Sequence, residues 1–179
     1  MLNLGIVGLS PGNGHPYSWS SICNGFDPQK MEDCPFPTIP RDLSQHNFPD
    51  EILQDVRVTA IWCQQRSVAE HVARAACIER VVDRLEDLQE GVDGILLARD
   101  DSENHARFAL PFLEAGFPLF IDKPMANRIT DAEALLDAQL HDAQIHTCSA
   151  FRYIPEVFTN FADPDRIGHV HRVEAEIGK

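Results

Sequence analysis

Short apolar segments alternate with amphipathic segments along this chain from its first residues to about residue 150. Strands are expected over residues 2–9, 57–62, 81–82, 94–98, 118–121 and 146–150. Strands that alternate with helices pair in parallel, because each helix carries the chain back to the end of the sheet where the next strand begins. The sequence therefore predicts an α/β fold with a doubly wound parallel sheet.

Helices are predicted between these strands, over residues 17–25, 67–77, 85–88, 102–116 and 130–140. Capping boxes are expected to open two of them, one formed by Ser67 with Glu70 and the other by Thr130 with Glu133. Pro111 should kink its helix or break it into two pieces.

The stretch from residue 27 to residue 50 interrupts the alternation because it contains five prolines. Such a density of proline allows turns and one brief helical piece at most. We expect a proline-rich insertion over the edge of the sheet.

The composition excludes several classes of function. The 179 residues include 15 Lys and Arg against 28 Asp and Glu, a net charge of −13, which disfavours nucleic acid and anionic membranes as partners. No apolar run approaches the roughly 20 residues of a membrane span, and no basic region leads into a signal-peptide core. We predict a cytoplasmic protein that binds a small molecule.

Cysteine and histidine give no metal pattern. The five cysteines include no C-x-x-C pair, so reduced and mostly buried thiols are expected. His169 and His171 would share one face of a strand, but no third ligand has a recognisable spacing to them. No metal site is predicted.

The most informative stretch runs from Pro118 to Pro124. Its apolar centre is typical of a strand buried on both faces, and Asp122 and Lys123 follow at its carboxyl end. Open α/β sheets bind ligands beyond the carboxyl ends of their strands, so these two side chains are candidate functional residues. The alternative is a surface ion pair in a turn that Pro124 closes.

A glycine-rich turn follows the first strand. Gly8, Gly12 and Gly14 indicate a phosphate-binding turn, although Ser10 replaces the second glycine of the G-x-G-x-x-G pattern and one extra residue is present. The same stretch matches the G-x-S-x-G nucleophile elbow of hydrolases. That function is disfavoured because Pro11 follows the serine and has no N–H for an oxyanion hole.

Four features together resemble the N-terminal domain of the glucose-fructose oxidoreductase, inositol dehydrogenase and MocA (Gfo/Idh/MocA) family of NAD(P)-dependent oxidoreductases. They are residues 5–8 with the glycine turn, Asn104 with His105, the segment 113–124 with its Asp-Lys-Pro, and residues 150–155. The Asp-Lys-Pro is similar to the family's Glu-Lys-Pro motif, with Asp122 in place of Glu. The resemblance implies a Rossmann-type domain over residues 1–150.

The family implies hydride exchange between NAD or NADP and a hydroxyl-bearing carbon, usually of a sugar or cyclitol. Lys123 would lie beside the reacting hydroxyl with its pKa lowered by burial and neighbouring cations, and Asp122 would orient it. His105 is either a third catalytic residue at the mouth of the site or an ordinary polar residue in the first turn of a helix.

The resemblance also implies a set of cofactor-binding residues. They are Gly8, Ser10, Gly12, Asn13, Gly14, His15, Gln64, Gln65, Arg66, Arg99, Asp100, Pro124 and Arg152. Residues 64–66 stand where an acidic residue would normally bind the cofactor ribose. Arg66 there would either meet the 2′-phosphate of NADP or face solvent, so the choice between NAD and NADP stays open.

The family's second domain would begin near Phe151, whereas the chain ends at Lys179. Residues 151–179 are therefore expected to hold only the start of an α+β substrate domain, with a helix face at Val157, Phe158 and Phe161 and a strand over residues 169–177. The chain is either a fragment or a short version of such an enzyme.

An apolar face on that last strand would favour a homo-oligomer. The altered glycine pattern leaves a second hypothesis, a non-catalytic nucleotide- or sugar-binding module that acts through self-association or a partner subunit.

Overall fold

The computed structural model describes residues 1–48, 50–155, 168, 171–172 and 174. The chain divides into two compact units, Met1–Thr147 and Cys148–Lys179. In the second unit a short 3₁₀-helix, η3 (Ala150–Tyr153), is capped by Ser149, whose side chain accepts a hydrogen bond from the N–H of Phe151. The expected helix face of residues 157–161 and most of the expected strand over 169–177 lie outside the described residues.

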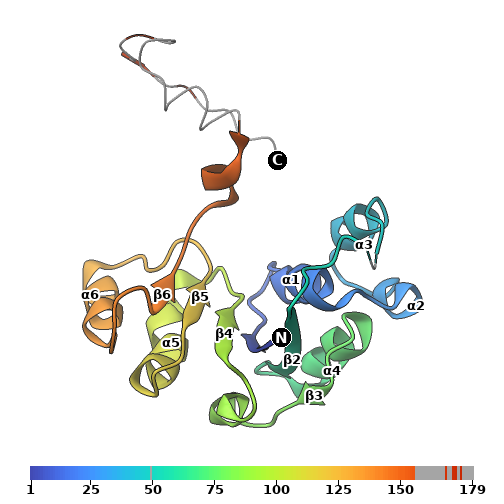
Figure 1. Ribbon diagram of the computed structural model, residues 1–179, viewed down its shortest axis with the longest axis horizontal. Coiled ribbons are helices and arrows are strands. Elements are labelled where there is room, and N and C mark those ends of the chain that lie inside the picture. The colour runs from blue at the N-terminus through green and yellow to red at the C-terminus, as the bar shows by residue number, and fades with distance from the viewer. Residues whose placement is uncertain (49, 156–167, 169–170, 173, 175–179) are drawn as a thin grey trace. The chain divides into compact units, whose positions relative to one another are not determined.

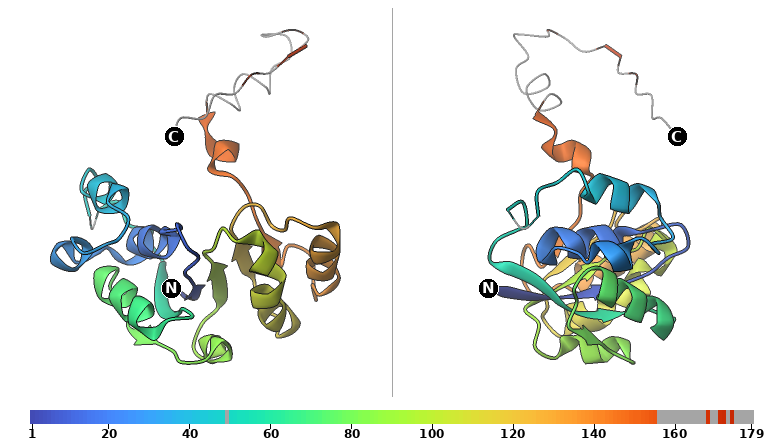
Figure 2. Two further views of the ribbon diagram at one scale, coloured as in Figure 1. Left: turned by 180° about the vertical axis from the view of Figure 1, so that it is seen from behind. Right: turned by 90° about the vertical axis from the view of Figure 1, so that its right-hand side faces the viewer.

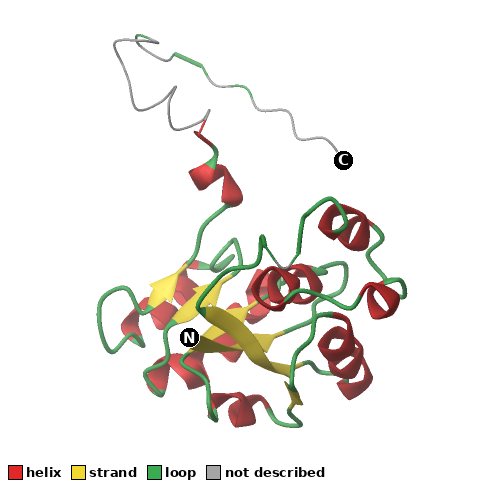
Figure 3. Cartoon of the chain, turned by 45° about the vertical axis from the view of Figure 1, so that its right-hand side comes forward, coloured by secondary structure: helices red, strands yellow, loops and turns green. Residues whose placement is uncertain are grey.

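The first unit is built on a six-stranded parallel sheet with the order β3-β2-β1-β4-β5-β6, shown in yellow in Figure 3. This is the strand order of a Rossmann fold, and it confirms the predicted doubly wound parallel sheet. The strands are β1 (Leu2–Val7), β2 (Val56–Trp62), β3 (Arg80–Val81), β4 (Gly94–Leu97), β5 (Leu119–Ile121) and β6 (Ile145–His146).

Helices connect the strands as the alternation predicts. They are α1 (His15–Asn24), α2 (Pro28–Met31), α3 (Thr38–Leu43), α4 (Arg66–Ala75), α5 (His105–Glu114) and α6 (Ile129–Asp137), with 3₁₀-helices η1 (Leu85–Gln89) and η2 (Ser102–Asn104). Figure 1 shows α1 to α4 gathered beside β2 and β3, and α5 and α6 beside β5 and β6. Among the described residues, no helix has both the length and the hydropathy needed to cross a bilayer.

The two faces of the sheet bury separate hydrophobic cores. Ile6 packs into the core that contains residues of α1 and α4, and its neighbour Val7 packs into the core that contains residues of α5 and α6. Successive residues of a strand point to opposite faces of the sheet. Both side chains are fully buried because helices cover both faces. Covering both faces holds the carboxyl ends of the strands, where the site forms, at one fixed edge.

The proline-rich insertion differs from its prediction. It contains two short helices rather than one, and these pack on other helices rather than over the sheet edge, α2 against α4 and α3 against α1. The left view of Figure 2 shows this segment on the outer side of α1. Met31 and Leu43 explain the packing, since both side chains are buried in the core beneath.

Both predicted capping boxes are wrong. Helix α4 starts at Arg66, so Ser67 lies inside it, and α6 starts at Ile129, so Thr130 lies inside that helix. Neither helix has a side-chain cap at its start. Pro111 lies within α5 without dividing it.

Candidate functional site

Three loops meet at the carboxyl edge of the sheet, where β1 lies beside β4 and β4 beside β5. The Ser10 hydroxyl, in the glycine turn after β1, donates to Asp100 Oδ1 after β4 at 2.6 Å. The Asn13 side chain, in the same turn, donates to Asp122 Oδ2 after β5 at 3.2 Å. The structure therefore brings the glycine turn together with both predicted strand ends, at the place where open α/β sheets bind ligands.

Asp122 is the centre of this arrangement and is only 2% exposed. Its Oδ2 atom lies 2.5 Å from Nδ1 of His15, and its Oδ1 atom accepts the backbone N–H of Lys123 at 2.8 Å. Burial alone would raise the pKa of Asp122, but the hydrogen bond and charge of His15, followed by the Lys123 N–H, hold this pKa below its ordinary value. The buried group is therefore a carboxylate that ties the glycine turn to the Lys123 turn.

His15 is held on two sides. Its ring stacks on Trp19, one turn further along α1, with ring centroids 4.9 Å apart and planes at 13°. Its backbone N–H donates to Asn13 Oδ1 at 2.7 Å. The Asp122 contact fixes the rotation of the ring, and the side chain keeps 35% of its surface exposed. The imidazole is thus oriented by the protein and open on one side.

Lys123 follows the buried carboxylate and its side chain is exposed. The burial expected to act on Lys123 is therefore not supplied by the described residues. The hydrogen bond between these two residues is made by the backbone, because Asp122 Oδ1 accepts the Lys123 N–H. Pro124, which is also exposed, continues the turn.

The loop after β4 contains a second buried network. Arg99 is 2% exposed, donates from Nε and Nη2 to Asp101 at 2.8 and 2.5 Å, and donates from Nη1 to Gln64 Oε1 at 2.8 Å. Its guanidinium also lies 4.5 Å from the ring centre of Phe108. Burial alone would raise the pKa of Asp101, but the hydrogen bonds donated by Arg99 and Asn104 hold this pKa below its ordinary value. Arg99 is therefore committed to the protein interior.

His105 lies at the start of α5 and is completely buried. Its Nε2 lies 2.9 Å from the carbonyl of Arg99 and its Nδ1 lies 3.1 Å from the carbonyl of Met125. The structure thus places this buried ring between the β4 and β5 loops. In this position it supports both loops.

The three glycines of the turn have different structural reasons. A Cβ atom at Gly8 would lie 2.5 Å from Pro16, and one at Gly14 would lie 2.4 Å from Ile39. These two glycines therefore make room for side chains of the protein itself. Gly12 has φ +85°, and a Cβ atom there would meet nothing within 4 Å, so it is the glycine that faces open space.

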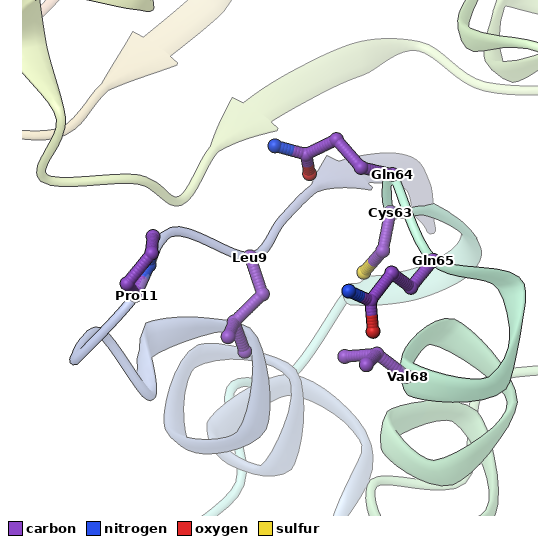
Figure 4. A pocket seen from close by; sticks show the side chains of 6 residues that line it. All are labelled: Leu9, Pro11, Cys63, Gln64, Gln65 and Val68. Carbon is purple, nitrogen blue, oxygen red and sulfur yellow. The ribbon is translucent and has the colours of Figure 1, made fainter.

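A cavity of about 310 Å³ lies between the glycine turn and the end of β2. Figure 4 shows Leu9 on the glycine-turn side and Cys63, Gln65 and Val68 opposite, with their side chains directed toward one another. Burial raises the pKa of the Cys63 thiol to about 12, so this wall is neutral. An apolar cavity edged by amides fits the adenosine end of a dinucleotide.

Arg66, the last of the three residues expected at this ribose position, is exposed and does not line the cavity. Its Nε donates to Glu70 at 2.9 Å and its Nη1 donates to Asp83. These two carboxylates raise the pKa of Arg66, with Asp83 contributing most. The guanidinium is therefore already paired with acidic side chains.

Arg152 lies in η3, within the second unit, so its predicted cofactor contact stays a prediction. Among the described residues, no group of three or more His, Cys, Asp and Glu side chains could hold a metal ion. Sequence reasoning missed Asp101, Trp19 and Asp83, whose contacts shape the site. The sequence did contain a signal for Asp101, because it follows Arg99 by two positions directly after a strand, where the two opposite charges can pair.

Comparison with known proteins agrees with this geometry. The model of a family described as oxidoreductases with an NAD-binding Rossmann fold, Gfo/Idh/MocA, matches residues 42–146. No curated protein matches the sequence.

Several solved structures are similar in fold. A Gfo/Idh/MocA family oxidoreductase from Vibrio cholerae has 18% identity and a TM-score of 0.62 over 93% of this chain and 44% of its own. A scyllo-inositol dehydrogenase from Lactobacillus casei, with bound NAD(H) and scyllo-inositol, has 16% identity and a TM-score of 0.60 over 93% of this chain and 42% of its own. A myo-inositol 2-dehydrogenase from Lactobacillus plantarum has 15% identity and a TM-score of 0.61, again over 93% and 42%. The chain spans less than half the length of these proteins.

Proposed function

Because the chain belongs to the Gfo/Idh/MocA family of oxidoreductases with an NAD-binding Rossmann fold, we propose that it forms the cofactor-binding part of an NAD(P)-dependent dehydrogenase. One observation carries the proposal. Lys123 extends from the carboxyl end of β5, and the carboxylate that precedes it is bonded to the glycine turn after β1. The backbone of Lys123, the proposed proton-transfer residue, is therefore held in a fixed position relative to the glycine turn, the proposed cofactor-binding segment.

The proposed reaction exchanges a hydride with a carbon that bears a hydroxyl group. Lys123 takes the hydroxyl proton as an amine, and as an ammonium it polarises a carbonyl in the reverse direction. Bound NAD(P) supplies the hydride acceptor. Asp122 keeps the Lys123 backbone in place by accepting its N–H, and His105 supports the same loop by contacting the Met125 carbonyl.

The residues of the turn and of the cavity fit a dinucleotide in two parts. Gly12 leaves open space beside the turn, where a diphosphate would lie, and the cavity between Leu9 and Val68 accepts a flat apolar group. Gln65 stands at the cavity wall with an amide that can bind ribose hydroxyls. Gln64, Arg99 and Asp100 hold the surrounding loops through the contacts described above.

The proposed substrate class rests on the similar structures rather than on a feature of this chain. Inositol dehydrogenases among the similar structures support a sugar or cyclitol, and the remaining substrate contacts would come from a second domain that starts near residue 151. The net charge of −13 disfavours nucleic acid and anionic membranes as partners, and the apolar residues Val173, Ala175 and Ile177 support a homo-oligomer.

A second candidate is a module that binds a nucleotide or sugar without catalysis. The start of α1 favours it, because Pro16 lacks an N–H and the His15 N–H is occupied by Asn13. If the chain binds neither NADH nor NADPH, the non-catalytic module becomes the better-supported function.

A fluorescence titration of the 179-residue chain with NADH and NADPH tests the proposal. Trp19 and Trp62 serve as energy donors to the nicotinamide. We expect saturable binding of at least one of the two cofactors. Absence of binding of either in a folded sample would contradict the proposal.

A matched pair of glycine variants locates the binding. Gly12 and Gly91 both have positive φ, +85° and +69°, and both have nothing within 4 Å of an added Cβ. Gly12→Ala and Gly91→Ala therefore introduce similar backbone strain, about 1 kcal/mol, at different places. We expect only Gly12→Ala to weaken NADH binding. Equal effects of the two variants would show that binding occurs elsewhere.

A further inference from the structure

We propose that His15, held by Asp122, supplies the positive charge that binds the cofactor diphosphate, and that nucleotide binding by this chain therefore weakens as the pH rises. This inference rests on the proposed function, because it concerns the same cofactor. It adds to His15, which the resemblance already places among the cofactor-binding residues, a specific ligand group, a protonation state and a dependence on pH.

The start of α1 offers few donors to a phosphate. In Rossmann domains the diphosphate is usually bound by N–H groups at this helix end. Here Pro16 has no N–H, and the N–H of His15 donates to Asn13 Oδ1 at 2.7 Å. The N–H of Tyr17 donates to the carbonyl of Gly14 at 2.9 Å. Three successive positions of the first turn are therefore closed to an anion.

The His15 side chain is placed to replace them. A carboxylate only accepts hydrogen bonds, so the Nδ1 atom that lies 2.5 Å from Asp122 carries a proton. Among the described residues Nε2 has no hydrogen-bond partner, and 35% of the side chain is exposed. The stack on Trp19 holds the ring plane. The imidazole is thus a fixed donor whose second nitrogen is open to a ligand.

The charges around the glycine turn favour binding of a diphosphate only when His15 is protonated. Asp122 and Lys123 lie at the end of β5, and Asp100, after β4, accepts the Ser10 hydroxyl of the turn itself. Two carboxylates against one lysine would repel a diphosphate if His15 were neutral. Asp122 Oδ2 lies 2.5 Å from Nδ1 and keeps the ring in this orientation. Binding should therefore weaken across the range where imidazoles lose their charge, between about pH 5 and 8.

Calorimetric titrations with ADP-ribose and with adenosine separate the diphosphate from the rest of the nucleotide. The diphosphate of ADP-ribose stays ionised throughout this range, so its own titration does not interfere. For the wild-type chain we expect ADP-ribose to bind about tenfold more weakly at pH 8 than at pH 6, the effect of one charged hydrogen bond. Adenosine, which has no phosphate, should bind equally at both pH values.

The variant His15→Asn distinguishes a charge from a merely structural role. Its amide N–H can still donate to Asp122 in place of Nδ1, but it has no group in the position of Nε2 and no charge. We expect weak binding of ADP-ribose at both pH values. His141→Gln removes an exposed histidine from the loop before β6 and should keep the wild-type dependence on pH.

The outcomes separate this inference from the proposed function. Equal binding of ADP-ribose at pH 6 and pH 8, or wild-type affinity in a folded His15→Asn variant, would overturn the role of His15 while leaving cofactor binding in place. If His15→Asn does not fold, as judged by circular dichroism, the comparison of ADP-ribose with adenosine in the wild type decides alone. Failure of the wild type to bind ADP-ribose at either pH would overturn both proposals.

Discussion

The carboxyl ends of β5 and β2 both carry charged side chains, but the two ends are built differently. After β5, Asp122 is buried and both of its oxygens are bonded to the protein. After β2, Arg66 is exposed, and its partners Glu70 and Asp83 are exposed as well. A buried carboxylate holds its neighbours in one geometry, whereas exposed ion pairs are screened by water and contribute little.

The difference indicates which strand end holds its side chains in one geometry and which end tolerates substitution. The β5 end determines the position of Lys123 relative to the glycine turn. The β2 end forms one wall of a cavity, with a neutral thiol and amides in place of the usual acidic residue. We therefore expect substitutions to have large effects near β5 and small effects near β2.

The largest expected effect is that of Lys123→Ala on catalysis. In a form of the enzyme that carries a substrate domain, loss of the proton-handling group should reduce turnover by about 10²-fold or more. Stability should stay near that of the wild type, because the side chain is exposed. The rate of NADH formation and a urea titration measure the two properties. Near-normal turnover would remove Lys123 from the mechanism and with it the functional contrast between the two strand ends.

The next effect is structural and concerns the β4 loop between the two ends. Arg99→Ala leaves the Asp101 carboxylate without its buried partner and should lower the free energy of unfolding by about 3 kcal/mol. Arg128→Ala is the control, since Arg128 makes a comparable contact to Asp131 but is 72% exposed. Urea unfolding followed by circular dichroism gives both values. Equal losses in the two variants would show that burial does not separate these ion pairs.

Much of this contrast could be predicted from the sequence. The features that could not be predicted were missed for physical reasons. Alternating apolar strands and helices predicted the sheet, and Asp122 and Lys123 were located because they directly follow a buried strand. The contact of His15 with Asp122 was not predictable, because it joins residues 107 positions apart. Nothing local to either residue specifies the other.

Local signals also failed where packing outweighed them. Pro28 does not prevent the first of the two helices, because it stands at the start of α2, where a missing N–H costs nothing. Asp27 caps that helix by accepting the N–H groups of Gln29 and Lys30. Burial of Met31 then fixes the segment on the core. The positions of the prolines therefore predict helix formation in this segment better than their number does.

Acid sensitivity provides a third test, and this one concerns the β5 end. A carboxylate whose folded-state pKa is lowered contributes stability above its unfolded pKa, near 3.9, and this contribution is lost as the pH falls through the folded pKa. Asp122→Asn should therefore cost about 2 kcal/mol at pH 7 and progressively less as the pH falls below about 4. Parallel stability curves for wild type and Asp122→Asn would contradict the assignment.

The smallest effect is expected for Arg66→Ala. The lost contacts to Glu70 and Asp83 are exposed and screened by water, so the urea midpoint of unfolding should stay close to that of the wild type. NADH affinity should stay within about twofold of the wild type, because Arg66 does not line the cavity and its charge is already matched by two carboxylates.

NADPH sharpens this last test, since only its 2′-phosphate would need a free cation at the β2 end. We expect the wild type to bind NADPH more weakly than NADH, and Asp83→Asn to improve NADPH binding by releasing Arg66 from one of its partners. Fluorescence titrations of the three proteins with both cofactors measure the ratios. Tight NADPH binding that Arg66→Ala abolishes would instead make Arg66 a cofactor ligand. The exposed end of β2 would then determine cofactor choice as firmly as the buried end of β5 places the lysine.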